Sequence, residues 1–282
     1  MAKKERVDIL LVEKGLIETR EKAKRSIMAG LIYVNEERID KPGMKIDTDS
    51  ILTIKGDVLP YVSRGGLKLE KAINRFNLSL QDKIVLDIGA STGGFTDCSL
   101  QNGAKLVYAL DVGYNQLAWK LRQDERVQVM ERTNFRYVKP EDLQEGMPDF
   151  ATIDVSFISL KLILPVLGTL LVNHGEVVAL VKPQFEAGRE EVGKKGIVRD
   201  PKTHTKVLTY MVEFALGQGY DVKGIDFSPI KGGEGNIEFL LYLSWEHGRE
   251  SGNRLADMTE DEVVASAHQQ LKDNNKADQN EG

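Results

Sequence analysis

Between Tyr61 and Trp245, short apolar segments alternate with amphipathic segments, and no other feature of the sequence constrains the fold as strongly. The apolar segments have the length and the β-branched content of buried strands. We predict seven strands, Lys83–Ile88, Lys105–Asp111, Val127–Met130, Asp149–Asp154, Glu176–Val181, Asp221–Phe227 and Ile237–Ser244. Helical patterns separate most of them, and one, Pro201–Gly219, begins with proline and ends with glycine. This order predicts an α/β fold with a doubly wound sheet.

The residues on either side of this region have a different character. Residues 1–60 combine two helical patterns with β-like alternation in "LIYVNEERI" and "SILTIKGD", which predicts a small α+β domain. Residues 246–282 carry 4 Lys+Arg and 9 Asp+Glu. We predict that this acidic tail is largely disordered, with one short helix capped by Thr259 and Glu262. The chain is therefore predicted to have three parts: 1–60, 61–245 and 246–282.

Charge and cysteine content limit the function classes. The net charge of −5 belongs to the tail, because the first 245 residues carry 34 Lys+Arg and 34 Asp+Glu. One cysteine, Cys98, excludes a disulfide framework and a cysteine-rich zinc site, so we expect a reducing compartment and no metal. The longest apolar stretch, Leu162–Val172, is about half of the roughly 20 residues that span a bilayer. With no signal-peptide pattern either, the sequence predicts a cytoplasmic protein without a membrane partner.

The segment "LDIGASTGGFTD", which begins at Leu86, ends the first strand with three glycines in six positions. Where a strand is followed by a helix, glycines let the backbone approach a ligand closely. The backbone amides at the start of the helix favour a polar group there. Asp111 ends the next strand, where a carboxylate commonly binds the hydroxyls of a ribose. The glycine spacing differs from the G-x-G-x-x-G of nicotinamide sites. Asp87 opposes a pyrophosphate but tolerates a ligand with an ammonium and a sulfonium; it is equally interpretable as a hydrogen-bonding partner of the helix.

"LDIGASTGGFTD" followed by "VYALDVG" resembles the first two motifs of S-adenosylmethionine-dependent methyltransferases. The resemblance implies a Rossmann-like sheet and S-adenosylmethionine as the cofactor. It implies that the cofactor-binding residues are Asp87, Gly89, Ala90, Ser91, Gly93, Gly94, Phe95 and Asp111. After the third strand, "ERTNFRYV" corresponds to the adenine-binding segment of that family, with Thr133 and Asn134 as candidates.

The strand ends also indicate which atom accepts the methyl group. Methylation of a base nitrogen usually goes with an N/D-P-P-Y/F motif after the fourth strand, which here reads "FATIDVSFI". Methylation of a pyrimidine carbon needs a thiolate, and Cys98 is better interpreted as a small core residue. Of the three kinds of methyl acceptor, an oxygen atom therefore remains. Charged residues inside apolar elements are costly unless they are paired, and four lie near ends that face one crevice: Lys68, Asp154, Lys182 and Glu238.

These four residues resemble the Lys-Asp-Lys-Glu tetrad of FtsJ/RrmJ-type RNA ribose 2′-O-methyltransferases, although each alone could equally belong to a surface ion pair. The resemblance implies that Lys182 is the base for the 2′-hydroxyl proton. That role requires its pKa to fall by about 3 from the usual value near ~10.4. Lys68, as a second cation, and partial burial would both lower the pKa. Asp154 and Glu238 would orient the lysines and the ribose.

Residues 1–60 resemble an S4 RNA-binding domain through Arg20, Ala23, Ile27, Gly30, Val34 and Asn35, although Asn35-Glu36-Glu37 replaces the usual Asn-Gly turn. Arg20 and Lys24 lie four residues apart, on one helix face, and such a cluster can bind phosphates. The RNA-binding candidates are Arg6, Arg20, Lys22, Lys24 and Arg25. A solvated mixed-charge helix containing Glu18 and Glu21 is the alternative, since the net charge of these 60 residues is only +1.

An S4-like domain followed by "YVSRGGLKL" and an FtsJ-like domain is similar to the TlyA family over about 245 of the 282 residues. The resemblance implies a ribosomal RNA cytidine 2′-O-methyltransferase that acts on 16S and 23S RNA, or on 23S RNA alone, with ribosomal RNA or ribosomal subunits as partners. Members are also labelled hemolysins. A membrane-active hemolysin and a non-catalytic ribosome-assembly factor are the rival functions; the first lacks a visible lytic segment, and the complete tetrad disfavours the second.

Overall fold

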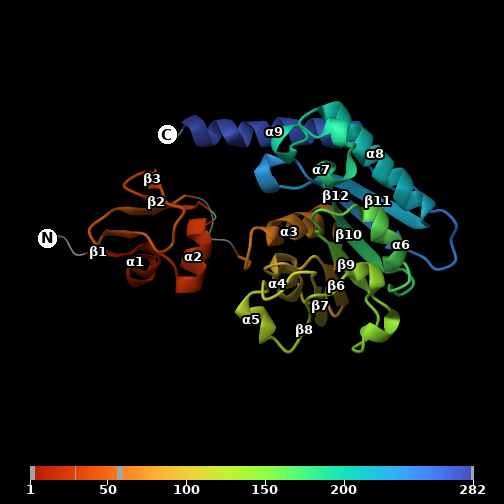
Figure 1. Cartoon of the computed structure of the whole chain (residues 1–282), viewed down its shortest axis with the longest axis horizontal. Helices are drawn as coiled ribbons and strands as arrows, with labels where there is room; N and C mark the ends of the chain where they lie inside the picture. Colours follow the sequence, from red (N-terminus) through yellow and green to blue (C-terminus); the bar gives the residue numbers. More distant parts are fainter. Residues whose placement is uncertain (1–3, 29, 56–59, 281–282) are drawn as a thin grey trace. The chain divides into compact units, whose positions relative to one another are not determined.

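The computed structural model describes residues 4–28, 30–55 and 60–280 (Figure 1). The chain divides into two units, Met1–Gly66 and Leu67–Gly282. The first corresponds to the predicted α+β domain. The second contains residues 67–245 of the predicted α/β domain and continues to the end of the chain.

The N-terminal unit packs two helices on short antiparallel strands. The helices are α1 (Val7–Glu13) and α2 (Arg20–Met28). One ladder joins β1 (Lys4–Arg6) to β4 (Lys45–Asp47), and a second has the order β3-β2-β5, with bounds Ile32–Val34 for β2, Glu37–Arg38 for β3 and Leu52–Ile54 for β5. Apolar residues of both helices and of the strands form its core, among them Val7, Leu11, Ala23, Ile27, Ile32 and Ile46.

The turn between β2 and β3 departs in sequence from the usual Asn-Gly, but it keeps the geometry of that turn. Asn35 and Glu36 have φ angles of 48° and 70°, as a type I′ turn requires of its two central residues. Asn adopts this conformation readily, whereas for Glu36 it costs about 1–2 kcal/mol relative to glycine. The side-chain oxygen of Asn35 accepts a hydrogen bond from the Ile51 amide at 3.0 Å, which holds the turn beside β5.

The second unit is built on a seven-stranded sheet with the order β11-β12-β10-β9-β6-β7-β8. The bounds are Ile84–Ile88 for β6, Leu106–Leu110 for β7, Val127–Met130 for β8, Phe150–Ile153 for β9, Glu176–Val181 for β10, Tyr220–Phe227 for β11 and Phe239–Trp245 for β12. The first five are parallel, and β12 runs antiparallel between β10 and β11. All seven predicted strands are present, with ends within two residues of the predicted ones, and the α/β fold is confirmed.

Helices connect the strands, and the chain reverses its direction of travel across the sheet between β6 and β9. The helices are α3 (Gly65–Phe76), α4 (Gly94–Gln101), α5 (Trp119–Arg122), α6 (Leu164–Leu167), α7 (Pro183–Glu186), α8 (Pro201–Gly217) and α9 (Glu260–Asn280). Short 3-10 turns occur at Phe135–Tyr137, Pro140–Asp142, Leu160–Leu162, Arg189–Glu191, Lys194–Gly196 and Gly233–Gly235. The reversal between β6 and β9 creates a crevice at their carboxyl ends, where open α/β sheets bind ligands.

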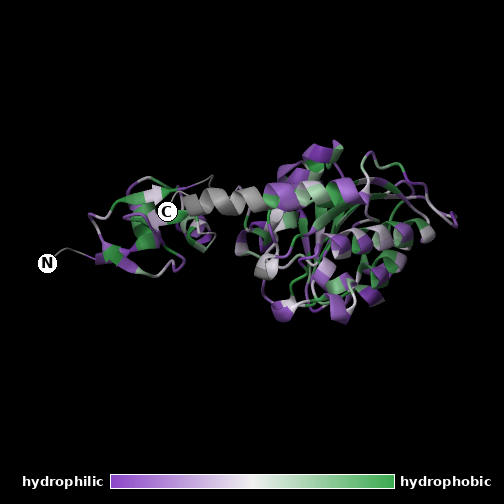
Figure 2. Cartoon of the chain, turned by 90° about the horizontal axis from the view of Figure 1, so that it is seen from above, coloured by the Kyte–Doolittle hydropathy of each residue, from purple (hydrophilic) through white to green (hydrophobic). Residues whose placement is uncertain are grey.

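The C-terminal residues correct one prediction, because residues 260–280 form a helix rather than a disordered tail. Helix α9 packs on α8 and β11, and its residues Val263, Val264, Ala267 and Leu271 are buried in the core of the second unit. These four residues recur at helical spacing and form a narrow apolar face. The prediction missed this face because most other residues of the segment are polar. In Figure 2, hydrophobic residues are interspersed among hydrophilic ones along the coloured part of α9.

The predicted cap of this helix is confirmed. The Glu262 carboxylate accepts hydrogen bonds from the amide and the hydroxyl of Thr259, at 2.8 and 2.9 Å, and the Thr259 hydroxyl accepts the Glu262 amide at 3.4 Å. The helix that follows is much longer than the short one predicted. Over residues 4–28, 30–55 and 60–280, no helix combines the length and the apolar character that crossing a membrane requires.

Candidate active site

Four charged side chains form one connected group beside the carboxyl ends of β9 and β10. The Lys182 Nζ lies 2.5 Å from Asp154 Oδ1, and the Lys68 Nζ lies 3.3 Å from Asp154 Oδ2. Lys68 also pairs with Glu238, whose Oε2 is 2.6 Å from the same Nζ. The four residues predicted from the sequence are therefore brought together as a chain, Lys182–Asp154–Lys68–Glu238. We call this group the tetrad.

Each member of the tetrad is positioned by an element of the sheet or by the helix in front of it. Asp154 directly follows β9, and its amide donates to Ile88 O of β6 at 3.0 Å. Lys182 directly follows β10 and precedes Pro183, the first residue of α7. Glu238 directly precedes β12, and Lys68 lies on α3. Elements far apart in the sequence thus converge on one point.

The electrostatics of the tetrad follow from burial and mutual attraction. Burial alone would raise the pKa of Asp154, but the charges of Lys68 and Lys182 outweigh it and lower the pKa. Burial alone would lower the pKa of Lys68, but the charges of Asp154 and Glu238 raise it. Lys68 is consequently held in its charged form at neutral pH, so it cannot accept a proton.

The glycine loop after β6 lies against the backbone of the tetrad residue Asp154. Gly89 has φ 87°, and a Cβ there would lie 2.6 Å from Asp154 O, so both its conformation and its neighbour require glycine. Ser91 and Gly93 also have positive φ angles, of 49° and 93°. A Cβ on Gly93 would lie 2.3 Å from Leu121 Cδ1. The loop therefore bends tightly, with Ser91 exposed at its tip.

Asp111 closes the other side of this loop. Its Oδ2 accepts a hydrogen bond from the Ser91 amide at 2.8 Å, and its Oδ1 accepts one from the Gly113 amide at 2.7 Å. A carboxylate has about four acceptor positions, so a partly exposed Asp111 retains capacity for two hydroxyl groups. This donor and acceptor set fits the ribose of an adenosine ligand.

Asp87 lies beneath the loop and has no exposed surface. Its two oxygens accept hydrogen bonds from the hydroxyls of Thr96 on α4, at 2.6 Å, and Thr152 on β9, at 2.9 Å. Burial is the main reason that the pKa of Asp87 rises to about 6. The hydrogen-bonding role that the sequence left open is therefore seen, and through it Asp87 joins α4 to β9 beneath the loop.

The other predicted cofactor-binding residues differ in accessibility. Ala90, Gly94 and Phe95 are buried within the loop and the first turn of α4. Thr133 is partly exposed, and its amide donates to Asp111 O at 3.0 Å. The side-chain oxygen of Asn134 accepts the Arg136 amide at 3.2 Å and so caps a 3-10 turn. Thr133 thus lies on the predicted ligand side of β7.

In the N-terminal unit, most of the predicted RNA-binding cations are paired with acids. Arg6 and Arg20 each donate to the buried Asp8 at 2.9 Å. Lys22 pairs with Glu18 at 2.5 Å, and Lys24 pairs with Glu21 at 2.7 Å. The fifth candidate, Arg25, is partly buried on α2. The acids of the mixed-charge alternative are therefore direct partners of the cluster, and the cations of these pairs remain one-third to one-half exposed.

The sequence pattern of the FtsJ-like methyltransferases matches residues 61–245, and that of the S4 domain matches residues 5–52. Over 250 residues, which are 88% of this chain and 93% of the relative, the sequence is 40% identical to the 16S/23S rRNA (cytidine-2′-O)-methyltransferase TlyA of Mycobacterium tuberculosis. The chain belongs to the TlyA family.

Two further relatives of the TlyA family carry different names. A Bacillus subtilis protein named "Putative rRNA methyltransferase YqxC" is 67% identical over 277 residues, covering 98% of each chain. A solved structure of a "Putative hemolysin" from Streptococcus thermophilus is 60% identical, with a TM-score of 0.78, and covers 98% of this chain and 100% of that one. Methyltransferase and hemolysin names therefore occur among relatives with one architecture.

Sequence reasoning about this TlyA-family chain missed two residues beside the tetrad. The Lys182 Nζ donates a hydrogen bond to Ser156 Oγ at 3.2 Å. Phe157 is 90% exposed, has φ 64°, and lies with its ring 5.1 Å from that of Phe185. Their only signal in the sequence is their place two and three residues after Asp154, at the end of a strand.

The remaining predictions about the chemistry of the chain concern thiols and metals. Cys98 lies within α4 and is fully buried, which confirms that it is a small core residue. Among residues 4–28, 30–55 and 60–280, no group of three or more His, Cys, Asp or Glu side chains is arranged to hold a metal ion.

Proposed function

We propose that this chain transfers a methyl group from S-adenosylmethionine to the 2′-oxygen of a cytidine in ribosomal RNA. The observation that carries the proposal is the tetrad, in which two lysines share one half-buried carboxylate beside a tight glycine loop. The name of the Mycobacterium tuberculosis relative supports the choice of substrate and acceptor atom. Acting on ribosomal RNA implies that the protein works in the cytoplasm.

The glycine loop would hold the cofactor, with Asp111 accepting hydrogen bonds from its ribose and with Thr133 and Asn134 near its adenine. The exposed side chains of Ser91 and Thr92 would offer hydroxyl groups to its polar atoms. When bound, this cofactor supplies an electrophilic methyl group carried on a positively charged sulfur. Asp87 would keep the loop in shape through its hydrogen bonds to Thr96 and Thr152.

Lys182 would accept the proton of the attacking 2′-hydroxyl. Its Nζ is held by Asp154 at 2.5 Å and by Ser156 at 3.2 Å, so its position is fixed before any substrate arrives. Lys68, kept charged by Asp154 and Glu238, holds the other oxygen of the Asp154 carboxylate at 3.3 Å. The oxygen lone pair that is freed would form the new O–C bond as the methyl–sulfur bond breaks and leaves a neutral thioether, and the proton would pass from Lys182 to solvent.

The N-terminal unit would supply RNA affinity rather than chemistry. Arg6, Arg20, Lys22 and Lys24 are paired on its surface, and exposed pairs of this kind are weak. A phosphate can therefore replace the carboxylate partner of such a cation at small cost. Together with Arg25, these residues are the proposed phosphate contacts.

The test is to map ribose methylation in ribosomal RNA that was treated with the protein and S-adenosylmethionine. Ribosomal subunits from cells that lack the gene provide unmodified substrate. Alkaline cleavage needs a free 2′-hydroxyl, so each modified cytidine should appear as a gap in the hydrolysis ladder. Subunits treated with the Lys182→Ala variant are the matched control and should give an unbroken ladder. A new methyl group on a base, with the ladder unbroken, would contradict the proposal.

A further inference from the structure

A loop between α7 and α8 carries cations that belong neither to the tetrad nor to the proposed cofactor site. Residues 193–199, which we call the basic loop, contain Lys194, Lys195 and Arg199, and all three side chains are exposed. Within the part of the chain that the structure describes, none of the three forms an ion pair, a hydrogen bond or a ring contact. They differ in this from four of the five predicted RNA-binding cations of the N-terminal unit, Arg6, Arg20, Lys22 and Lys24, which are paired.

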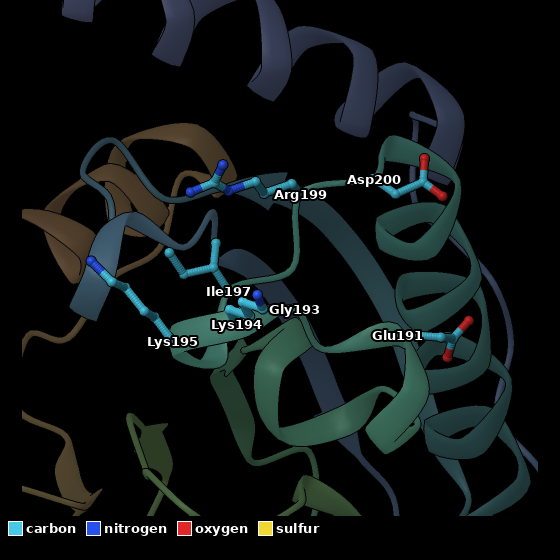
Figure 3. Close-up of a pocket in the computed structure, with 7 residues that line it drawn as sticks. All are labelled: Glu191, Gly193, Lys194, Lys195, Ile197, Arg199 and Asp200. Atoms are coloured by element: carbon cyan, nitrogen blue, oxygen red, sulfur yellow. The ribbon is translucent and has the colours of Figure 1, made fainter.

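The acids that flank the basic loop are occupied elsewhere. Glu191 pairs with Lys206 of α8 at 2.8 Å, and Asp200 caps α8 by accepting the Lys202 amide at 3.2 Å. The loop borders an open cavity of about 510 Å³. Figure 3 shows the side chains of Lys195 and Arg199 extending to one side of the loop, whereas the carboxylates of Glu191 and Asp200 extend to the other. One side of the loop therefore carries uncompensated positive charge.

A buried side chain, Asn236, ties the basic loop to the segment before β12. Asn236 is 2% exposed. Its Oδ1 accepts the Val198 amide at 3.0 Å, and its Nδ2 donates to Gly196 O at 3.0 Å and to Gly233 O at 3.2 Å. The two loops are thus joined through one amide whose donors and acceptor are all used.

The same segment before β12 lies directly against the tetrad. A Cβ on Gly232 would lie only 2.0 Å from Glu238 Oε1, so the backbone at Gly232 contacts the carboxylate that pairs with Lys68. The Glu238 carbonyl in turn accepts the Ser228 amide at 2.8 Å. Asn236 therefore fixes the basic loop relative to a residue of the tetrad.

We propose that Lys194, Lys195 and Arg199 bind the phosphodiester backbone of the RNA substrate next to the methylated nucleotide, and that Asn236 is the positioning residue that holds them there. RNA carries a negative charge at every phosphate, and neutralising it with cations releases counterions. Cations held by a fixed loop lose little freedom on binding, so more of the electrostatic attraction is retained. This inference rests on the proposed function for the identity of the substrate.

The first experiment measures RNA binding by the full-length protein, with 16S and 23S transcripts tested separately and without cofactor. Replacing Lys194 and Lys195 by alanine should weaken binding by about tenfold. The slope of log affinity against log salt concentration should also become shallower by about 1–2. The matched control replaces Lys105 and Lys223, two exposed lysines at the start of β7 and on β11, and changes the net charge equally. The control should bind like the wild type. Equal weakening by both double variants, or no weakening by either, would overturn the proposal.

A second experiment tests Asn236 with a double-mutant cycle. Asn236→Ala should itself weaken RNA binding and speed hydrogen exchange of the amides in the basic loop. If Asn236 acts by holding the lysines, removing Lys194 and Lys195 should then cost clearly less in the Asn236→Ala background than in the wild type. Additive effects would overturn the positioning role.

Steady-state kinetics separate this inference from the proposed function. The Lys194→Ala, Lys195→Ala variant should raise the KM for ribosomal RNA while keeping kcat and the affinity for S-adenosylhomocysteine. If the wild type methylates no ribose but the basic loop still governs RNA binding, the proposed function fails and this inference stands. If the wild type methylates ribose and the loop variants bind RNA like the wild type, this inference fails and the proposed function stands.

Discussion

Both units of the molecule place an aspartate between two cations, but the cations differ in how exposed they are. In the N-terminal unit, Asp8 is bonded by Arg6 and Arg20, whose side chains stay 36% and 49% exposed. In the methyltransferase unit, Asp154 is bonded by Lys68 and Lys182, which are only 9% and 8% exposed. An exposed cation can exchange its partner for a phosphate, whereas a buried lysine keeps its place beside its carboxylate. Burial of the cation thus distinguishes the proposed RNA-binding pairs from the proposed catalytic ones.

The strongest test of this comparison removes the buried lysine. Lys182→Ala should lower methyl transfer by about 10²–10⁴-fold, the usual effect of losing an acid–base group. Lys182→Arg should not restore activity, because a guanidinium stays charged and accepts no proton. Binding of RNA and of S-adenosylhomocysteine, measured by calorimetry, should be retained in both variants. A fully active Lys182→Ala enzyme would end the catalytic interpretation of the tetrad.

Removing the shared carboxylate of the tetrad should be nearly as severe. Asp154→Ala leaves the two lysines buried without their common partner, which is expected to destabilise the methyltransferase unit by about 3–5 kcal/mol. Both tryptophans, Trp119 and Trp245, lie in this unit, so urea unfolding followed by their fluorescence measures the effect. Asp8→Ala should not change that transition. A loss below about 1 kcal/mol for Asp154→Ala would mean that the lysines reach water, as the arginines do.

The second buried aspartate of the methyltransferase unit, Asp87, is bonded by hydroxyls instead of cations. Its pKa in the folded state is about 6, above the usual value for aspartate, so the folded state binds this proton more tightly than the unfolded state does. Stability should therefore decrease as the pH rises from about 4 to about 6, by up to about 3 kcal/mol. Asp87→Asn should remove that part of the pH dependence when tryptophan-detected unfolding is compared at pH 4 and pH 7. Parallel pH profiles for the two proteins would contradict the assignment.

The pH dependence of stability that Asp8 contributes should have the opposite sign to that of Asp87. The hydrogen bond from Arg6, with a further contribution from Arg20, lowers the pKa of Asp8 to about 2. Its contribution to stability is present above pH 4 and is lost as the pH falls toward 2. Because both arginines are partly exposed, we expect only about 1–2 kcal/mol. Hydrogen exchange of α1 and α2 at pH 5 and pH 3 measures the effect. In Asp8→Asn the acid-dependent increase in exchange should be absent.

The smallest expected effect concerns the exposed cations themselves. Replacing Arg20 and Lys24 by alanine removes up to two phosphate contacts, so the salt dependence of RNA binding should become shallower by up to about 1–2. Fluorescence titrations of ribosomal RNA at several salt concentrations give the slope. An unchanged slope would mean that these residues only pair with Asp8 and Glu21. The exposed cations would then have no role in RNA binding.

The parts of the site that could be predicted are those determined by strand ends. Once the seven strands were assigned, Asp154 and Lys182 had to lie side by side, because parallel neighbouring strands end at the same edge of a sheet. The glycine loop was equally predictable, since positive φ angles at Gly89 and Gly93 call for glycine. Local pattern and topology were sufficient for these features.

The features that were missed depend on partners far away in the sequence. Asp87 bonds to Thr152, 65 residues further along, and nothing near Asp87 in the sequence indicates this contact. Asn236 bonds to Gly196 across 40 residues, so its role in holding the basic loop is equally invisible. Helix α9 was missed for another reason, because four apolar residues on one face do not change the average composition of an acidic segment.

Helix α9 also ties residues outside the matched FtsJ-like region to the core of the methyltransferase unit. The FtsJ-like pattern ends at residue 245, yet Val263, Val264, Ala267 and Leu271 are buried where α9 packs on α8 and β11. Truncation after residue 245 is therefore expected to expose the apolar surface that these four residues cover, and so to lower the solubility of the shortened chain.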